Sequence, residues 1–174
     1  YIEYAKRDIN DILMKITVYN RGPEAATIHV IPHLWFRNFW KHNGRFSKPE
    51  IVSVSDNCLQ TRSSRNGSFF LYRRMYGRTN DSVFVKDGIN NYIVNKEDTV
   101  NLDKQGTKAA IWLKEKIQPG ASKTFNIRLS KIELDDPWIG FEDIFARRRL
   151  DTDNYYDQLA PKNLSTEHKA LLRS

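Results

Sequence analysis

The sequence predicts a mainly β protein, an antiparallel β-sandwich over residues 1–134, followed by a helical linker over residues 135–174. Short runs with apolar residues at alternate positions recur along the first part of the chain, and turn-forming residues separate them. No helical pattern lies between these runs, which favours an antiparallel sandwich over a parallel sheet. The chain has 174 residues, of which 40% are hydrophobic, and this suits one domain with a substantial core.

Two β-rich runs near the amino terminus predict a first hairpin. Residues 12–19 carry apolar side chains at every second position, which is the period of a strand with one buried face. Residues 20–23, Asn-Arg-Gly-Pro, supply turn chemistry before a second β-rich run over residues 26–36. Pro32 interrupts the second run, and because proline lacks an amide donor we expect a bulge or a sheet edge there.

Further strands are predicted in the middle and later parts of the chain. Three short β-prone runs stand at residues 51–54, 68–76 and 82–85. Residues 108–117 and 123–129 flank the turn sequence Gln118-Pro119-Gly120-Ala121. We therefore expect a second hairpin around this turn.

The pattern changes at residues 135–137, Asp-Asp-Pro, where an acidic residue can cap a helix and proline can occupy its first turn. We expect this helix to run to about Leu159, because Pro161 cannot continue it. Ser165 is the expected cap of a last helix. The apolar residues of the first helix recur at helical spacing and are Trp138, Phe141, Ile144 and Phe145.

The formal net charge of +7 is concentrated between residues 37 and 78. Such a segment can meet a polyanion or an acidic face of a neighbouring domain. Since the chain carries no nucleic-acid-binding motif, we interpret the segment as a solvated surface and expect no nucleic-acid partner. Its basic residues are Arg37, Lys41, Arg45, Lys48, Arg62, Arg65, Arg73, Arg74 and Arg78, against Glu50 and Asp56.

The sequence predicts no metal site, no cofactor and no membrane span. His29 and His33 would lie about 13 Å apart in an extended strand, too far to share an ion. Cys58 and His42 carry no signature of a nucleophile and its base, and we interpret them as incidental. No apolar run approaches the roughly 20 residues of a membrane helix. A single cysteine fits a reducing compartment, so we expect a cytoplasmic protein, and the missing initiator Met predicts that the chain starts within a longer polypeptide.

Four segments, in the same order, resemble one family of enzymes. The longest is ILMKITVYNRGPEAATIHVIPHLWFRNFW, residues 12–40, and the others are residues 85–92, 106–110 and 145–149. Together they resemble the amino-terminal domain of bacterial family 63-like glycoside hydrolases, a family that includes α-glucosidases of oligosaccharides. The resemblance spans most of the chain.

This resemblance implies a supersandwich-like β domain that packs against an (α/α)₆ barrel, in which the catalytic carboxylates reside. The implied parent enzyme cleaves glucosidic or similar bonds with inversion, with one carboxyl group as acid and another activating water. Neither carboxylate matches a residue of this chain, so we expect the chain alone to be inactive. Its expected partner is its own C-terminal catalytic domain, through which it would meet an oligosaccharide substrate.

Residues 35–40, Trp-Phe-Arg-Asn-Phe-Trp, form the densest aromatic and polar cluster of the sequence. Flat rings beside guanidinium and amide donors are what a sugar face and its hydroxyl groups require, so Trp35, Arg37 and Asn38 are candidate substrate-framing residues. The alternative, which we favour, is that alternate rings fill the sandwich core and the rest pack against the barrel.

Residues 86–90, Lys-Asp-Gly-Ile-Asn, predict a polar loop with a central glycine, which is poor core material. We predict that Lys86, Asp87 and Asn90 of this loop line the mouth of the parent enzyme's active site. A free-standing module that binds carbohydrate or a polyanion is the alternative function.

Overall fold

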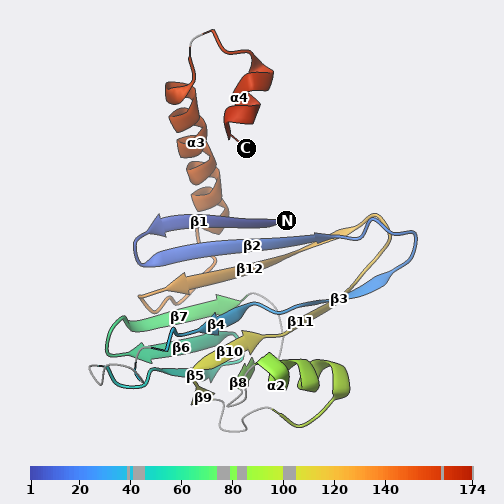
Figure 1. The fold of residues 1–174 in the computed structure, drawn as a ribbon, viewed down its shortest axis with the longest axis vertical. Helices are drawn as coiled ribbons and strands as arrows, with labels where there is room; N and C mark the ends of the chain where they lie inside the picture. Colours follow the sequence, from blue (N-terminus) through green and yellow to red (C-terminus); the bar gives the residue numbers. More distant parts are fainter. Residues whose placement is uncertain are drawn as a thin grey trace.

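The protein is mainly β, and its strands form a sandwich with two helices at the C-terminal end (Figure 1). This description rests on a computed structural model that describes residues 1–38, 40, 46–73, 79–81, 86–99, 105–161 and 163–173. No helix in these residues is long and apolar enough to cross a membrane.

The first layer is a seven-stranded antiparallel sheet. Its central strands pair over long registers, with Phe125 opposite Ile16 and Leu129 opposite Leu71. In sheet order the strands are β1 (Ile2–Asp8), β2 (Asp11–Tyr19), β12 (Ser122–Ser130), β7 (Gly67–Arg73), β6 (Cys58–Ser63), β5 (Glu50–Ser55) and β9 (Gln105–Gly106).

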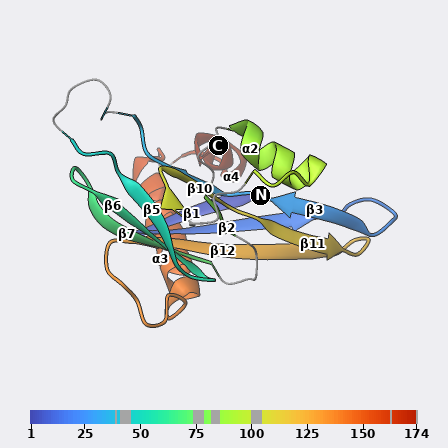
Figure 2. The same ribbon diagram turned by 90° about the horizontal axis from the view of Figure 1, so that it is seen from below.

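Two smaller sheets form the second layer, as Figures 1 and 2 show. One contains three strands, and the other contains two. The three strands are β4 (His33–Trp35), β10 (Lys108–Ile111) and β8 (Thr79–Asp81), and the two are β11 (Leu113–Ile117) and β3 (Ala26–Val30).

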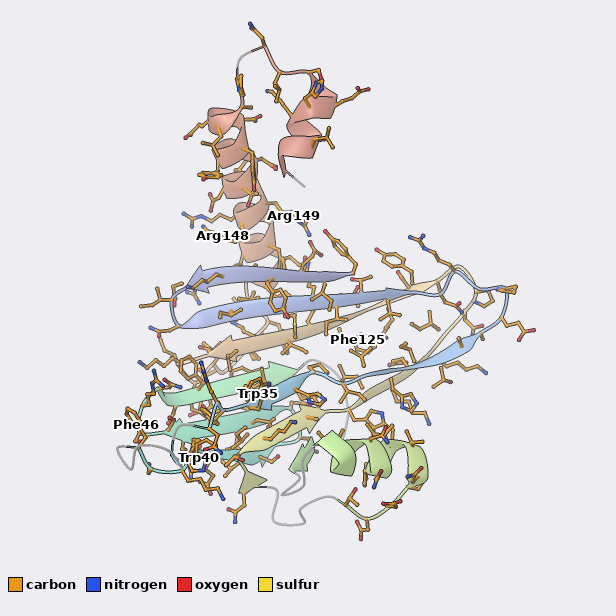
Figure 3. The ribbon with its side chains drawn as sticks, viewed as in Figure 1. Trp35, Trp40, Phe46, Phe125, Arg148 and Arg149 are labelled. Atoms are coloured by element: carbon orange, nitrogen blue, oxygen red, sulfur yellow. The ribbon has the colours of Figure 1, made fainter. Side chains whose placement is uncertain are left out.

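The main core lies between the layers, because alternate residues of each strand point to the same face. Phe125, at 2% exposure, lies at its centre and is labelled in Figure 3. The other fully buried members are Ile51, Leu59, Leu71, Ala109, Ile111, Leu113 and Ile127. Met14, Ile16 and Val18 of β2 pack against it, which confirms the predicted core face of residues 12–19 except at Ile12, which is 38% exposed.

Both predicted hairpins are wrong, because the turns connect different layers. β2 pairs with β1 and β12, whereas β3 pairs with β11. The turns at residues 20–25 and 118–121 are therefore two arches that lie side by side. Asn20 joins them, since its backbone amide donates to Ala121 O at 2.9 Å and its side-chain amide donates to Ile117 O at 2.9 Å.

The interruption at Pro32 is confirmed, and it marks a change of sheet. β3 ends at Val30 in the two-stranded sheet, and β4 begins at His33 on the edge of the three-stranded sheet. Proline supplies no amide donor here, but its carbonyl accepts a hydrogen bond from Ile111 N at 2.9 Å.

The middle strands follow the prediction in part. β5 and β7 lie where the runs at residues 51–54 and 68–76 predicted strands, with residues 74–76 outside the described residues. β6 was not predicted, because its alternation Leu59, Thr61 is short and mixed with polar residues. The run at residues 82–85 also lies outside the described part of the chain.

Residues 131–141 and the helix that follows cover the outer face of the large sheet. α3 (Phe141–Leu159) places Phe141 and Phe145 against Ala5 and Leu13, in a second small core. Lys15 is 8% exposed in this interface, where its ammonium pairs with Glu142 and lies 4.4 Å from the centre of the Phe145 ring. The predicted helical stripe of aromatic residues is thus confirmed as a packing surface.

The helix starts later than predicted. Asp136 Oδ1 accepts from Trp138 N at 2.8 Å and closes a turn, and α3 begins only after Gly140, which adopts a φ of 67°. α3 ends at Leu159 as expected, and Ser165 Oγ accepts from His168 N at 3.3 Å, which confirms the cap of α4 (Thr166–Arg173). Figure 1 shows that α3 projects away from β1 and that α4 turns back beside it.

The polar loop predicted at residues 86–90 is helical, so that prediction is wrong. These residues form α2 (Lys86–Asn90), which continues into the π-helix η1 (Asn91–Asn95). Gly88 and Ile89 are buried, and Ile89 packs with Ile93 and Ala110. The apolar residues at positions 89 and 93 share one helical face, and this face outweighs the polar composition of the segment.

Candidate functional site

A groove of about 390 Å³ lies at one end of the sandwich and combines an exposed tryptophan with polar side chains. Its size falls within the roughly 300–1,000 Å³ of small-molecule sites. We call it the Trp35 groove. Its described lining consists of Asn10, Leu34, Trp35, Phe36, Arg37, Thr61, Asn66, Phe69, Leu129 and Lys131.

The register of the large sheet brings the polar lining together. Ser130 at the end of β12 pairs with Asp11 at the start of β2 and with Phe70 near the start of β7. Therefore the β1–β2 turn, the end of β12 and the β6–β7 turn meet at one end of the sheet. These three segments supply Asn10, Lys131 and Asn66 to the groove.

Hydrogen bonds hold the backbone of all three segments in place. Lys131 N donates to Asn10 O at 2.9 Å, and Asn10 N donates to the Asp8 carboxylate at 2.7 Å. In the β6–β7 turn, Ser63 Oγ accepts from Asn66 N at 3.3 Å. The backbone amides of Asn10, Asn66 and Lys131 are thus all hydrogen-bonded within the protein, while the three residues line the hollow.

Trp35 reaches the groove because β4 alternates between core and surface. Leu34 and Phe36 pack against the main core, whereas Trp35 is 62% exposed. Leu129 and Phe69, both half-buried on the inner face of the large sheet, supply further apolar lining. A large flat ring is therefore presented beside an apolar surface, as ring stacking requires.

The described charged residues that line the groove are all positive. Arg37 and Lys131 carry positive charges, and none of its described lining residues is acidic. Asn10 and Asn66 add amide groups that can donate and accept hydrogen bonds. The lining can thus hold a ligand that has a flat apolar face, hydroxyl groups and negative charge.

A smaller hollow adjoins the Trp35 groove and shares Phe36, Arg37 and Asn66 with it. Phe46 and Trp40 lie in its lining, and the Arg65 guanidinium is 5.6 Å from the centre of the Phe46 ring. Figure 3 shows Trp35, Trp40 and Phe46 at the same end of the molecule. The aromatic cluster of the sequence thus spans two neighbouring hollows.

The structure brings together only some of the predicted site residues. Trp35 and Arg37 line the groove, whereas Asn38 is exposed outside its lining. Lys86, Asp87 and Asn90 belong to α2, which Figures 1 and 2 place far from the β6–β7 end of the sandwich.

Sequence reasoning missed Lys131, Asn10 and Asn66. Each stands in or next to a turn, and no local pattern distinguishes it from other polar turn residues. The signal that could have found them is the strand pairing, because turns at the same end of an antiparallel sheet meet in space.

A third hollow, of about 410 Å³, lies on the outer face and contains Cys58 together with Glu133 and Asp135. Burial, and then the nearby Glu133 carboxylate, raise the pKa of the Cys58 thiol to about 11. The thiol is therefore protonated at neutral pH and is a poor nucleophile. His42, its hypothetical base, lies outside the described residues.

The second surface of interest is formed by α3 from Leu150 onward together with α4, which we call the C-terminal arm. Leu150 and Tyr155 are each 58% exposed, and Leu159 is 56% exposed. Arg149 of α3 forms an ion pair with Glu3 of β1 at 2.7 Å. Beyond this pair, the arm carries apolar side chains away from the sandwich (Figure 1).

No family model matches the sequence. The chain is similar to the uncharacterised protein YMR196W of Saccharomyces cerevisiae, with 24% identity over 234 residues. The match covers 99% of this chain and 21% of the yeast protein, so the chain spans about a fifth of that relative's length. The name of the yeast protein states no activity.

Proposed function

We propose that this chain is the non-catalytic, N-terminal domain of a glycoside hydrolase that acts on oligosaccharides. In this proposal the sandwich packs against a helical catalytic barrel and helps to frame its active site. The resemblance of residues 12–40 and three later segments to family 63-like enzymes supports it. A yeast relative about five times longer than the matching segment is also consistent with one domain of a larger protein.

The observation that carries the proposal is the C-terminal arm. Large apolar side chains at Leu150, Tyr155 and Leu159 stand more than half exposed on a helix that leaves the sandwich. Burying each such side chain would contribute about 1.5–3 kcal/mol, so a second domain that covered them would be held firmly. The occupant proposed is the catalytic barrel, whose helices could pack against α3 and α4.

The first test is the intact mass and activity of the native gene product. We expect a mass several times that of this chain and the release of glucose or a related sugar from an α-linked oligosaccharide. A product of the size of this chain, without hydrolytic activity, would overturn the proposal.

A double variant of the native product tests the arm directly. Leu150→Ser with Leu159→Ser should lower kcat/KM by roughly tenfold and make the junction sensitive to protease, because buried apolar contacts worth more than about 1.4 kcal/mol are lost. Tyr19→Ser is the matched control, since Tyr19 is 55% exposed at the end of β2, in the sandwich. Equal effects of the two changes would argue against docking through the arm.

The second candidate function is a free-standing carbohydrate-binding module. The exposed Trp35 in a groove of polar residues favours it, because such modules bind sugars without any catalytic partner. The mass measurement separates the two candidates: a native product no larger than this chain that binds sugar would be the module.

A further inference from the structure

The Trp35 groove has a charge pattern that neutral sugars do not need. A neutral oligosaccharide is recognised by stacking on rings and by hydrogen bonds to its hydroxyl groups, which Trp35, Asn10 and Asn66 can supply. The groove nevertheless also carries Arg37 and Lys131, and no carboxylate is found in its described lining.

These two cations come from different layers. Arg37 follows β4 of the three-stranded sheet, and Lys131 follows β12 of the large sheet. Since both residues line the same groove, a ligand that lies in it meets one cation from each layer. A guanidinium can bind a carboxylate or phosphate with two parallel hydrogen bonds, and an ammonium adds a point charge.

The backbone of Lys131 is fixed at the edge of the groove. Its backbone amide is bonded to Asn10 O at 2.9 Å, and its Cε lies 3.7 Å from the position that a Cβ of Gly67 would occupy. Gly67 has a φ of 76°, a conformation that glycine adopts without strain, and it therefore permits the turn beneath the lysine stem.

We propose that the Trp35 groove binds an anionic sugar, with its ring on Trp35 and its carboxylate or phosphate group between Arg37 and Lys131. The inference rests on the proposed function only in taking carbohydrate as the ligand class. It names a narrower class than that function requires, because a domain that frames a site for oligosaccharides needs no preference for charge.

The test measures binding of four probes to the full 174-residue chain by calorimetry. The probes are a disaccharide that contains a glucuronate, the matching neutral glucose disaccharide, glucose 6-phosphate and inorganic phosphate. We expect at least one anionic sugar to bind at least about tenfold more tightly than the neutral disaccharide, and this preference to fall as salt rises.

Variants locate the binding. Lys131→Met should remove most of the preference for the anionic sugar. Trp35→Ala should lower the affinity for all the sugars by roughly tenfold, because stacking on the ring is lost. The matched controls are Lys114→Met on β11, an exposed lysine outside the groove, and Tyr19→Ala, which removes an aromatic ring that is 55% exposed. Both controls should leave binding unchanged.

Each outcome decides the inference. Equal affinity for neutral and anionic sugars would overturn it while leaving an oligosaccharide-binding role intact. Phosphate binding as tight as that of the sugars would also overturn it, because the ring would then contribute nothing. Absence of any sugar binding would overturn it as well, and the mass and activity of the native product would still decide the proposed function separately.

Discussion

Arg128 is a buried cation whose charge is balanced by the carboxylate of Asp11, at the start of β2. Its Nε and Nη2 donate to the two carboxylate oxygens of Asp11 at 2.9 and 2.5 Å, and Nη1 donates to Pro137 O at 2.7 Å. Asp11→Ala should therefore lower the free energy of unfolding by about 3–5 kcal/mol, because it leaves a buried positive charge without its partner. Urea unfolding followed by circular dichroism measures this loss.

The pair of Glu50 with Arg62 provides the control for that variant. It spans 3.5 Å, and both side chains are at least 40% exposed. Glu50→Ala should cost less than about 1 kcal/mol, as exposed ion pairs do. Similar losses from the two variants would contradict the assignment of Asp11 as the counter-charge of Arg128.

The thiol of Cys58 should react slowly in the native protein. Burial raises its pKa from 9.0 to about 11, so at pH 8 the thiolate fraction falls by about a hundredfold. Alkylation by iodoacetamide at pH 8 should therefore be slow in buffer and fast in urea, and the native rate should climb as the pH approaches 11. A native rate equal to that in urea would contradict the buried position.

The raised pKa of Cys58 also makes the stability of the protein fall at high pH. Because the pKa of the folded thiol is raised, the native protein retains a proton that the unfolded chain has already lost between pH 9 and about 11. The contribution of Cys58 to stability is thus fully present below pH 9 and is lost as the pH rises toward 11.

At the scale of elements, the two arches depend on one side chain. Asn20 accepts from Gly22 N at 3.0 Å and donates to Glu24 O at 2.7 Å and to Ile117 O at 2.9 Å. Asn20→Ala removes these three bonds and should destabilise the protein by about 1–3 kcal/mol, with faster amide exchange at this end of the sandwich. If amide exchange accelerates equally at the opposite end of the sandwich, near the β6–β7 turn, Asn20 does not stabilise the arches locally.

The arches also show where prediction from sequence stops. The alternation in residues 12–19 and the helical stripe that ends at Phe145 could be predicted, because each depends on the period of a single element. Asn-Arg-Gly-Pro predicts a turn, but the same turn residues serve a hairpin and an arch. The choice depends on strand pairing with residues about a hundred positions away.

In the groove too, residues close in the sequence could be predicted, and residues brought together by strand pairing could not. Trp35 and Arg37 were predicted because they lie in one dense cluster of the sequence. Lys131 and Asn10 were missed because only the register between β2 and β12 brings them together. Residues 86–90 were misinterpreted because their composition is polar, whereas the burial of Ile89 decides their structure.

At the scale of the whole molecule, the groove and the root of the arm lie close along the sheet. The β1–β2 turn supplies Asn10 to the groove, and Leu13 near the start of β2 packs under Phe145 on the opposite face. The groove and α3 thus lie on opposite faces of the large sheet, near the start of β2.

The arm should be separable from the sandwich. The contacts that hold α3 on the sheet include those of Phe141 and Phe145 and the Lys15–Glu142 and Arg149–Glu3 pairs, all made by the first half of the helix. A chain that ends after Leu150 keeps them, so its free energy of unfolding should change by less than about 1 kcal/mol. A chain that ends after Gly140 loses two buried rings, and truncating each ring would cost about 3–5 kcal/mol by itself.

Urea unfolding of the two truncated chains distinguishes structural from docking roles for the arm. If only the shorter chain is destabilised, the exposed side chains of the arm contribute nothing to the sandwich. A partner domain that covers these side chains would then explain why they are apolar, because an exposed apolar helix face lowers solubility without stabilising the fold. If both chains lose the same stability, the arm is part of the sandwich's own fold, and the argument for a docked catalytic domain fails with it.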